Sequence, residues 1–357
     1  MKTVGKHQRK RLSLRDIAEA AGVSRMTVSL ALRNDRRLPE CTRERIKRIA
    51  DEMGYKPDPK VAELLAHIRK GRSRKHGTTI AFLITWPEEG SPFVYPNFRR
   101  RWEGAKRRAG ELGYALRAFR LRDEAIPPER LSRMLWNRGI QGILLGPLCE
   151  QLGETSNRCA ELKWDLFTAV TLSHSFSRPR LDCIEHDHFR SVRMVYNRLH
   201  AKGYRRIGLA MERHLDIRTD HRWLGGFLTE QHANAEKAPI PPLLLRGSEV
   251  QAFQQWLETW EPDAIIGINP TIRRLLGQLS GRVPQDVTYA HLDLDEHFAG
   301  VSGVDQVPER IGREAIDLLV GRIHQGEHGP PDQPVEVTVC GVWVDGTTAP
   351  GRHDNER

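Results

Sequence analysis

Residues 24–29, with the sequence SRMTVS, combine a guanidinium, a thioether and three hydroxyls within two helical turns. Arg25 can pair bidentately with guanine, whereas Met26 offers apolar contact to a thymine methyl group. The hydroxyls of Ser24, Thr27 and Ser29 and the guanidinium of the upstream Arg15 are suited to phosphate contacts. A set of this kind at one end of a helix predicts contact with double-stranded DNA.

Two short helices are expected to position these side chains. Apolar residues recur at helical spacing over residues 14–21 and again over residues 25–32. Gly22 permits the left-handed backbone that ends the first helix, and Ser24 is a natural N-cap for the second. The pattern predicts a helix-turn-helix with the second helix as recognition helix, and an ordinary helical hairpin is the alternative. For Thr27 and Ser29, a structural role at the helix start also remains open.

A third amphipathic helix is predicted over residues 39–53, and a proline-containing break separates it from the segment VAELLAHIRK. The motifs LRDIAEAAGVSRMTVSLAL, TRERI and GYKPDP followed by VAELL resemble the DNA-binding headpiece and hinge helix of the LacI/GalR family. The resemblance implies that Arg25 and Met26 occupy the main base-reading positions. It also implies a hinge leucine that wedges into the minor groove, which a gap-free count places at Leu64. In another register, Leu65 or Val61 would occupy this position. A different role for Leu64, packing against the hinge helix of the partner chain, is also open.

The positive charge of the chain lies at its N-terminal end. Residues 1–75 carry 21 Lys and Arg against 9 Asp and Glu, whereas the remaining residues carry 35 against 37. This placement is expected if the N-terminal end meets phosphates. A solvated basic tail is the alternative for the first residues, and we expect residues 1–12 to form a disordered basic arm.

Apolar runs alternate with amphipathic helices from residue 78 onward. Strands are expected at 79–86, 114–121, 142–146, 166–172, 206–211, 242–245, 264–268, 287–292 and 335–344. Helices are expected at 97–112, 128–138, 188–202, 221–232, 249–259, 271–280 and 308–325. The alternation predicts two doubly wound parallel-sheet lobes. The fold class is therefore an all-α helix-turn-helix headpiece plus an α/β body, and the body resembles the family's type I periplasmic-binding-protein-like fold.

The predicted domains are a basic arm (1–12), the headpiece (13–58), a hinge helix and linker (59–77), an effector-binding and dimerisation body (78–348) and a polar tail (349–357). The short polar tail lacks the family's tetramer-forming heptads, so we expect a homodimer.

Small ligands of doubly wound sheets bind beyond the carboxyl ends of the strands. The residues predicted to line such a cleft are Trp86, Phe98, Arg222, Asn269, Asp293 and Gln306. Aromatic side chains would supply an apolar face, and the polar ones could bind sugar hydroxyls. Arg222, Asn269 and Asp293 also match family effector-binding positions. Sugar-responsive relatives often carry an aspartate where this chain has Thr171 and Ser173, which leaves the ligand class open.

Metal and catalytic chemistry are not favoured by the sequence. His186 and His188 alternate in a segment expected to be extended, and His291, Asp293 and Asp295 alternate in another, as zinc ligands can. Because both segments fall where the family has polar strand ends, we predict no metal site and no cofactor. No nucleophile context, phosphate-binding glycine loop or HExxH motif is present, so an enzyme is not expected.

Five scattered cysteines without a CxxC motif fit a reducing compartment. No signal peptide and no run of about 18 apolar residues is present, so a cytoplasmic protein without a membrane partner is expected. The sequence predicts a transcription regulator, most simply a repressor, that binds a pseudo-palindromic operator as a dimer and responds to a small ligand such as a sugar. The alternatives are a DNA-binding regulator with a ligand-silent body and a sugar-binding protein.

Overall fold

The computed structural model describes residues 12–32, 38–55, 79–85, 92–121, 126–147, 158–174, 176, 178–234, 238–247, 249–268, 270–278 and 287–351. Two compact units divide the chain, one with residues 1–78 and 320–328 and the other with residues 79–319 and 329–357. The predicted basic arm and hinge helix, with Leu64, Trp86 and Asn269, lie outside the described residues.

The headpiece consists of α1 (Leu14–Ala21), α2 (Arg25–Leu32) and α3 (Glu40–Glu52). Gly22 has a φ of 65°, the left-handed conformation that ends α1 and turns the chain toward α2. The three helices bury one apolar cluster, whose fully buried members are Ile17, Ala18, Ala21, Val28, Ala31, Ile46 and Ala50. The predicted helix-turn-helix is therefore confirmed, with α3 packed behind it.

Lobe one, part of the second unit, is built on a sheet with the order β11-β5-β4-β3-β1-β2, and all of its pairings are parallel. Its strands are β1 (Thr79–Ile84), β2 (Ala115–Arg120), β3 (Gly142–Leu145), β4 (Thr168–Thr171), β5 (Asp182–His186) and β11 (Glu336–Val339). One face packs against α6 (Pro128–Asn137) through Leu83, Ile143 and Leu135. The other face places Phe82 against Trp102 of α5 (Pro96–Glu111). Short 3₁₀ turns lie at Pro92–Val94 and Trp164–Leu166.

Lobe two has a sheet with the order β12-β10-β9-β8-β6-β7, in which β12 alone runs antiparallel to its neighbour, β10. Its strands are β6 (Ile207–Glu212), β7 (Leu243–Leu245), β8 (Ala264–Gly267), β9 (Thr288–His291), β10 (Ser302–Asp305) and β12 (Val342–Val344). Its helices are α8 (His188–Ala201), α9 (Arg213–Arg218), α10 (Arg222–Ala233), α11 (Val250–Trp260) and α12 (Pro270–Gln278), with a 3₁₀ turn at Glu296–Phe298.

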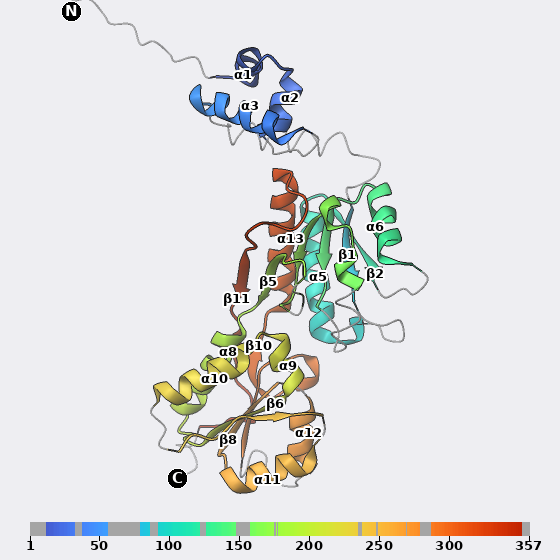
Figure 1. The fold of residues 1–357 in the computed structure, drawn as a ribbon. Helices are drawn as coiled ribbons and strands as arrows, with labels where there is room; N and C mark the ends of the chain where they lie inside the picture. Colours follow the sequence, from blue (N-terminus) through green and yellow to red (C-terminus); the bar gives the residue numbers. More distant parts are fainter. Residues whose placement is uncertain are drawn as a thin grey trace, which may run out of the picture. The chain divides into compact units, whose positions relative to one another are not determined.

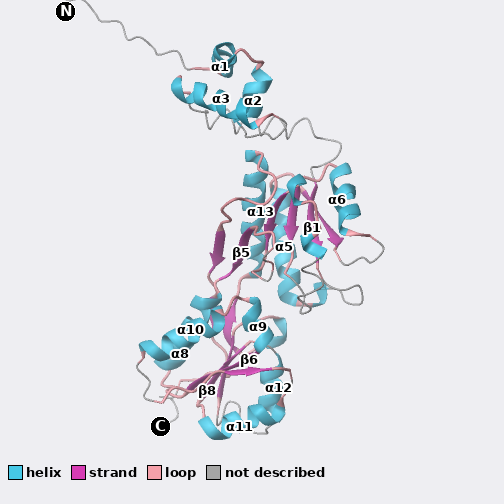
Figure 2. Cartoon of the chain, in the orientation of Figure 1, coloured by secondary structure: helices cyan, strands magenta, loops and turns pink. Residues whose placement is uncertain are grey.

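Helices cover both faces of the second sheet (Figures 1 and 2). Alternate strand residues face opposite ways, so Leu209 and Ile266 pack with α8 and α10, whereas Ile265 packs with α11 and α12. The helix α13 (Pro308–Gln325) follows β10 and leads back toward β11. This architecture confirms the predicted pair of doubly wound lobes. None of the described helices is long and apolar enough to cross a membrane.

Four elements differ from the sequence prediction, one of them the short helix α9, which was not expected. The strand expected at 335–344 is two strands, β11 and β12, in different sheets. Gly341 lies between them, where a Cβ would come within 2.5 Å of Val304 Cγ1. The strands β5 and β10 were not expected, because the sequences DCIEH and SGVD each contain polar residues and few apolar ones, although both strands are buried. At the other end of the body, Ala349 is buried and the Pro350 carbonyl accepts a hydrogen bond from the Tyr204 hydroxyl.

Candidate functional site

The recognition helix α2 begins at a side-chain cap. The Thr27 backbone N–H donates to Ser24 Oγ at 3.1 Å, and the two hydroxyls lie 2.8 Å apart. This cap satisfies one of the free N–H groups of the first turn and fixes where the helix starts. Ser24 and Thr27 therefore have a structural role in the headpiece, in addition to the phosphate contacts predicted for them.

The predicted base-reading side chains project from the capped end of α2. Arg25 is exposed, and Met26 is 72% exposed although it is apolar. Ser29 is half-buried, and Arg15 is exposed on α1. An exposed methionine beside an arginine, on a helix whose other face is buried, leaves a surface suited to a base edge.

Two predicted ligand-binding residues lie together at the carboxyl ends of the lobe-two strands. Asp293 follows β9 and accepts a hydrogen bond from Asn97 Nδ2 of α5 at 2.7 Å. Gln306 follows β10 and is buried, and its Nε2 donates to the Leu292 carbonyl at 3.0 Å. The Arg101 Nη2 group lies 3.5 Å from Gln306 Oε1. The structure therefore brings Asp293 and Gln306 together with a guanidinium from lobe one.

Arg222 belongs to a different cluster. It opens α10 and forms an ion pair with Glu336 of β11, with Nη2 3.0 Å from Oε2. These hydrogen bonds raise the pKa of Arg222. His174 Nε2 lies 3.0 Å from both Glu336 Oε1 and Glu185 Oε2. Arg222 therefore lies among side chains of lobe one rather than beside Asp293.

Phe98 does not line an open apolar surface as predicted. Its ring is 8% exposed and packs edge-on against Phe82 and Phe93, at centroid distances of 5.7 and 5.4 Å. Helical spacing places Phe98 on the inner face of α5, where aromatic packing holds it in the core of lobe one. The structure therefore places Phe98 in the core, and a role for its ring as the apolar face of a ligand site stays a prediction.

The sequence analysis did not single out the three consecutive arginines at 99–101 as candidate site residues. Arg100 Nε donates to Glu309 at 2.6 Å and its Nη2 to Asp305 at 2.9 Å, while Arg99 pairs with Glu296. A run of arginines on a helix is usually a solvated face, so the sequence carried no signal for these bonds. Arg101 is half-buried, and its Nε atom has no hydrogen-bond partner among the described residues.

Burial shifts two carboxyl groups in this region. It raises the pKa of Asp293 to about 6, opposed by the positive charge of Arg101. It also raises the pKa of Glu185 to about 7, opposed by His174 and Arg101. Arg101 thus acts electrostatically on both the Asp293 and the Glu185 clusters. Partly protonated carboxyls beside an unsatisfied guanidinium can hydrogen-bond a polar ligand through both donors and acceptors.

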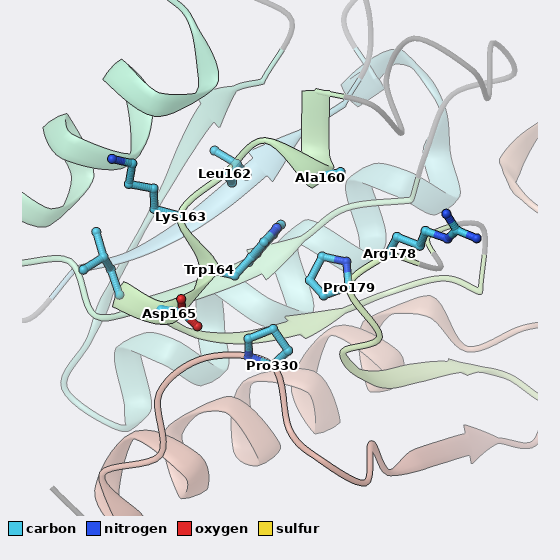
Figure 3. Close-up of a pocket in the computed structure, with 9 residues that line it drawn as sticks. Ala160, Leu162, Lys163, Trp164, Asp165, Arg178, Pro179 and Pro330 are labelled. Carbon is cyan, nitrogen blue, oxygen red and sulfur yellow. The ribbon is translucent and has the colours of Figure 1, made fainter. Parts of the chain in front are cut away.

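A pocket of about 590 Å³ lies elsewhere on lobe one, around Trp164 (Figure 3). Its lining residues are Ala160, Leu162, Lys163, Trp164, Asp165, Leu166, Arg178, Pro179 and Pro330. The Trp164 indole N–H is already bonded to the Cys159 carbonyl at 2.9 Å. None of the predicted ligand-binding residues lines this pocket, so it does not bear on that prediction.

Two parts of the chain match described families. Residues 13–58 match "Bacterial regulatory proteins, lacI family". Residues 196–347 match "Periplasmic binding protein-like domain". The first range contains the whole headpiece, and the second contains most of lobe two.

Full-length relatives extend the match across both units. The chain is 24% identical over 330 residues to the HTH-type transcriptional repressor PurR of Photobacterium profundum, covering 88% of this chain and 93% of that protein. It is 24% identical over 339 residues to the HTH-type transcriptional regulator PtxS of Pseudomonas putida, covering 90% and 92%.

Solved structures with the same fold include a complex of the transcriptional regulator CelR with cellobiose, at a TM-score of 0.59 and 21% identity over 95% of this chain and all of that one. The lac repressor dimer bound to operator and the anti-inducer ONPF has a TM-score of 0.56 and 19% identity, covering 96% and 100%.

Proposed function

The chain belongs to the LacI family of bacterial regulatory proteins, and from this premise we propose that it binds a pseudo-palindromic operator as a homodimer and represses transcription. The observation that carries the proposal is the exposed pair Arg25 and Met26 at the capped end of α2. Two such helices in a two-fold dimer would read half-sites about one helical turn of DNA apart. Leu64 would act at the centre of the site, as the family's hinge leucine does.

Selection of binding sites from random duplexes tests this proposal with the full-length protein. We expect a two-fold symmetric consensus and a steep fall in affinity with salt, because phosphate contacts release counterions. Equal affinity for every duplex would reject sequence-specific recognition. Sedimentation of the protein–DNA complex at its equivalence point gives the stoichiometry, for which two chains per site are expected.

A small polar metabolite is proposed to modulate DNA affinity from the strand ends of lobe two. Asp293, Gln306 and Arg101 support this part of the proposal, because they converge there with unsatisfied hydrogen-bonding capacity at Arg101 Nε. Trp86 and Asn269 remain predicted contributors. Coupling between the ligand and DNA would be about 1–3 kcal/mol.

A ligand-silent body is the second candidate, and a specific observation favours it. Groups that would bind a ligand already have partners within the chain, since Arg222 pairs with Glu336 and Asp293 with Asn97. Near these groups, Arg99 and Arg100 join lobe one to Glu296 and Asp305 of lobe two. A ligand would have to compete with these internal contacts.

A thermal-shift screen separates the two candidates. The panel contains sugars, sugar acids and nucleobases, and it includes cellobiose because a structural neighbour is a cellobiose complex. A ligand that binds only the folded state at 100 times its Kd would add about 2.7 kcal/mol of stability. The rise should vanish in Asp293→Ala and persist in Asp332→Ala, which changes an exposed loop carboxylate. A flat panel with folded, DNA-competent protein favours the silent body.

We further infer that the protein acts in the cytoplasm, where its DNA target lies, and that it acts by binding rather than by catalysis. The relatives support this reading, since both are named as transcription regulators. A sugar-binding protein without a DNA function is disfavoured by the lacI-family match of the headpiece.

A further inference from the structure

Two neighbouring strands of lobe one, β5 and β11, place a thiol and two carboxylates on the same face of the sheet. Cys183 and Glu185 lie two residues apart in β5, so their side chains point the same way. Glu336 of β11 is the register partner of Cys183 and shares that face. His174 lies three residues beyond the end of β4, the strand that pairs with β5 on its other side. Residues far apart in the sequence therefore meet at one point.

Three of these residues are close enough to share an ion. One donor atom each of His174, Cys183 and Glu185 lies within 4.8 Å of the other two. His174 Nε2 and Glu185 Oε2 are 3.0 Å apart. Bonds of about 2.0–2.2 Å from zinc to nitrogen and oxygen, at a tetrahedral angle, would place two ligand atoms about 3.3–3.6 Å apart. The observed separation is therefore near that of a ligand pair before any rearrangement.

Polar atoms at this point are buried without hydrogen bonds among the described residues. They are His174 Nε2, Glu185 Oε2 and both ring nitrogens of His188. Glu185 is 4% exposed and His188 is 5% exposed. The approach of His174 Nε2 to Glu185 Oε2 lacks hydrogen-bond alignment despite its length. His174 and His188 make charged contacts with Glu185 and Glu336 at 3.0–3.2 Å, but none of these contacts is an aligned hydrogen bond. The hydrogen-bonding capacity of these buried atoms is therefore open to a ligand.

We propose that His174, Cys183 and Glu185 bind a transition-metal ion of the zinc type. Imidazole, thiolate and carboxylate together form a donor set that suits Zn²⁺. His188 Nε2 is 3.2 Å from Glu185 Oε1 and could provide a further nitrogen ligand. As the ion binds, a bond forms between it and the Cys183 sulfur, and the thiol proton is released to solvent.

The neighbouring charges are compatible with an added cation. Glu336 already neutralises Arg222 through paired hydrogen bonds, which leaves the Glu185 carboxylate facing Arg101 and His174. Ionisation of Cys183 supplies a further negative charge to offset the ion. The sequence did not reveal this site, because its donors belong to β5 and to the loop before it. His186 alternates with Cys183 and Glu185 along β5 and packs against His188 and Trp223.

Cobalt titration of the untagged, full-length protein after chelator treatment tests the proposal. Co²⁺ replaces Zn²⁺ and reports on its ligands by absorption, so we expect a thiolate-to-cobalt charge-transfer band that saturates at one ion per chain and disappears when Zn²⁺ is added. Cys183→Ser should abolish the band. The matched control, Cys41→Ser, removes an exposed thiol of the headpiece and should leave the band unchanged.

Two more variants test whether misfolding, and not the loss of a ligand, explains a missing cobalt band. Glu185→Gln keeps the side-chain shape, and His174→Ala alters a partly exposed loop residue. Each should weaken Co²⁺ binding about tenfold or more while unfolding remains cooperative. A wild-type protein that is folded but gives no charge-transfer band would overturn the proposal and leave an ion-pair cluster of His174 with Glu185 and Glu336. An undiminished band in folded Cys183→Ser or Glu185→Gln would overturn it as well.

Discussion

Gly104 of α5 packs directly against the backbone of Glu309 at the start of α13. A Cβ at Gly104 would lie 2.1 Å from the Glu309 carbonyl oxygen. The contact is reciprocal, since a Cβ at Gly312 of α13 would lie 2.1 Å from the Arg101 carbonyl oxygen. Because the two helices approach at backbone distance, Arg100 can reach both Glu309 and Asp305. Two glycines thus determine the position of the arginines that join the lobes.

Gly104→Ala should therefore destabilise the body. The added methyl group meets backbone, which cannot rotate away, so a cost of about 1–3 kcal/mol is expected. Urea unfolding followed by circular dichroism measures it. The matched control is Gly110→Ala in the same helix, where no atom lies within 4 Å of the added Cβ. That change should be neutral or stabilising by up to about 1 kcal/mol. Equal effects of the two substitutions would contradict the close-packing argument.

Much of the fold follows from apolar periodicity, and the exceptions are instructive. The helix predicted at 308–325 has the bounds of α13, because its apolar face repeats along its whole length. The strand β5 escaped prediction because its sequence, DCIEH, is buried through polar contacts rather than apolar packing. The run at 335–344, predicted as one strand, contributes strands to two different sheets. The only local sign of this is Gly341, where an added Cβ would clash with neighbouring atoms.

The candidate site was predictable only where one helix contains it. Arg25 and Met26 sit on a local motif, so their exposure follows from the buried positions of Val28 and Ala31. Arg101, by contrast, belongs to a run of three arginines whose members have different partners. Those partners lie far along the chain, in lobe two and α13, and no local pattern specifies such pairings.

Ser24→Ala should destabilise the headpiece by about 1 kcal/mol, because the Thr27 N–H then loses its acceptor. The loss of stability is measured by thermal unfolding of the headpiece, followed through its helical circular dichroism. Ser24→Asp retains a capping oxygen and should preserve most of the stability, although its charge would weaken DNA binding. If Ser24→Ala unfolded at the wild-type temperature, the hydrogen bond from Thr27 N–H to Ser24 Oγ would add no measurable stability to the headpiece.

Arg25→Ala should cost about 1–3 kcal/mol on the selected operator and relax the preference at one base pair. Fluorescence anisotropy with the operator and its single-base variants measures both effects. Arg15→Ala is the comparison, since a phosphate contact should weaken binding to all duplexes about equally and reduce the salt slope by about 1. Uniform weakening by Arg25→Ala would place its guanidinium on a phosphate instead of a base.

The Asp293 carboxyl should make stability depend on pH between about 4 and 6. Its pKa is about 6 in the folded protein, mainly because of burial, against an ordinary value of 3.8. The folded state therefore holds this proton more tightly than the unfolded chain does. The stability that it contributes is complete below about pH 4 and is lost as the pH rises to about 6. The upper bound on this loss is about 3 kcal/mol, which solvent around the half-buried carboxyl reduces.

The substitution Asp293→Asn isolates that contribution, because the amide oxygen can still accept the hydrogen bond from Asn97 Nδ2. Urea unfolding of both proteins at about pH 3, 4, 5, 6 and 7, a range that spans the two pKa values, gives the difference in their free energies of unfolding. That difference should shift in favour of the Asp293→Asn variant as the pH rises through the folded-state pKa of about 6 and should then level off. Other titrating groups, including Glu185, cancel in the comparison to the extent that they do not couple to Asp293. A pH-independent difference would show that Asp293 is ionised at an ordinary pKa and that its contact with Asn97 offsets the cost of burial.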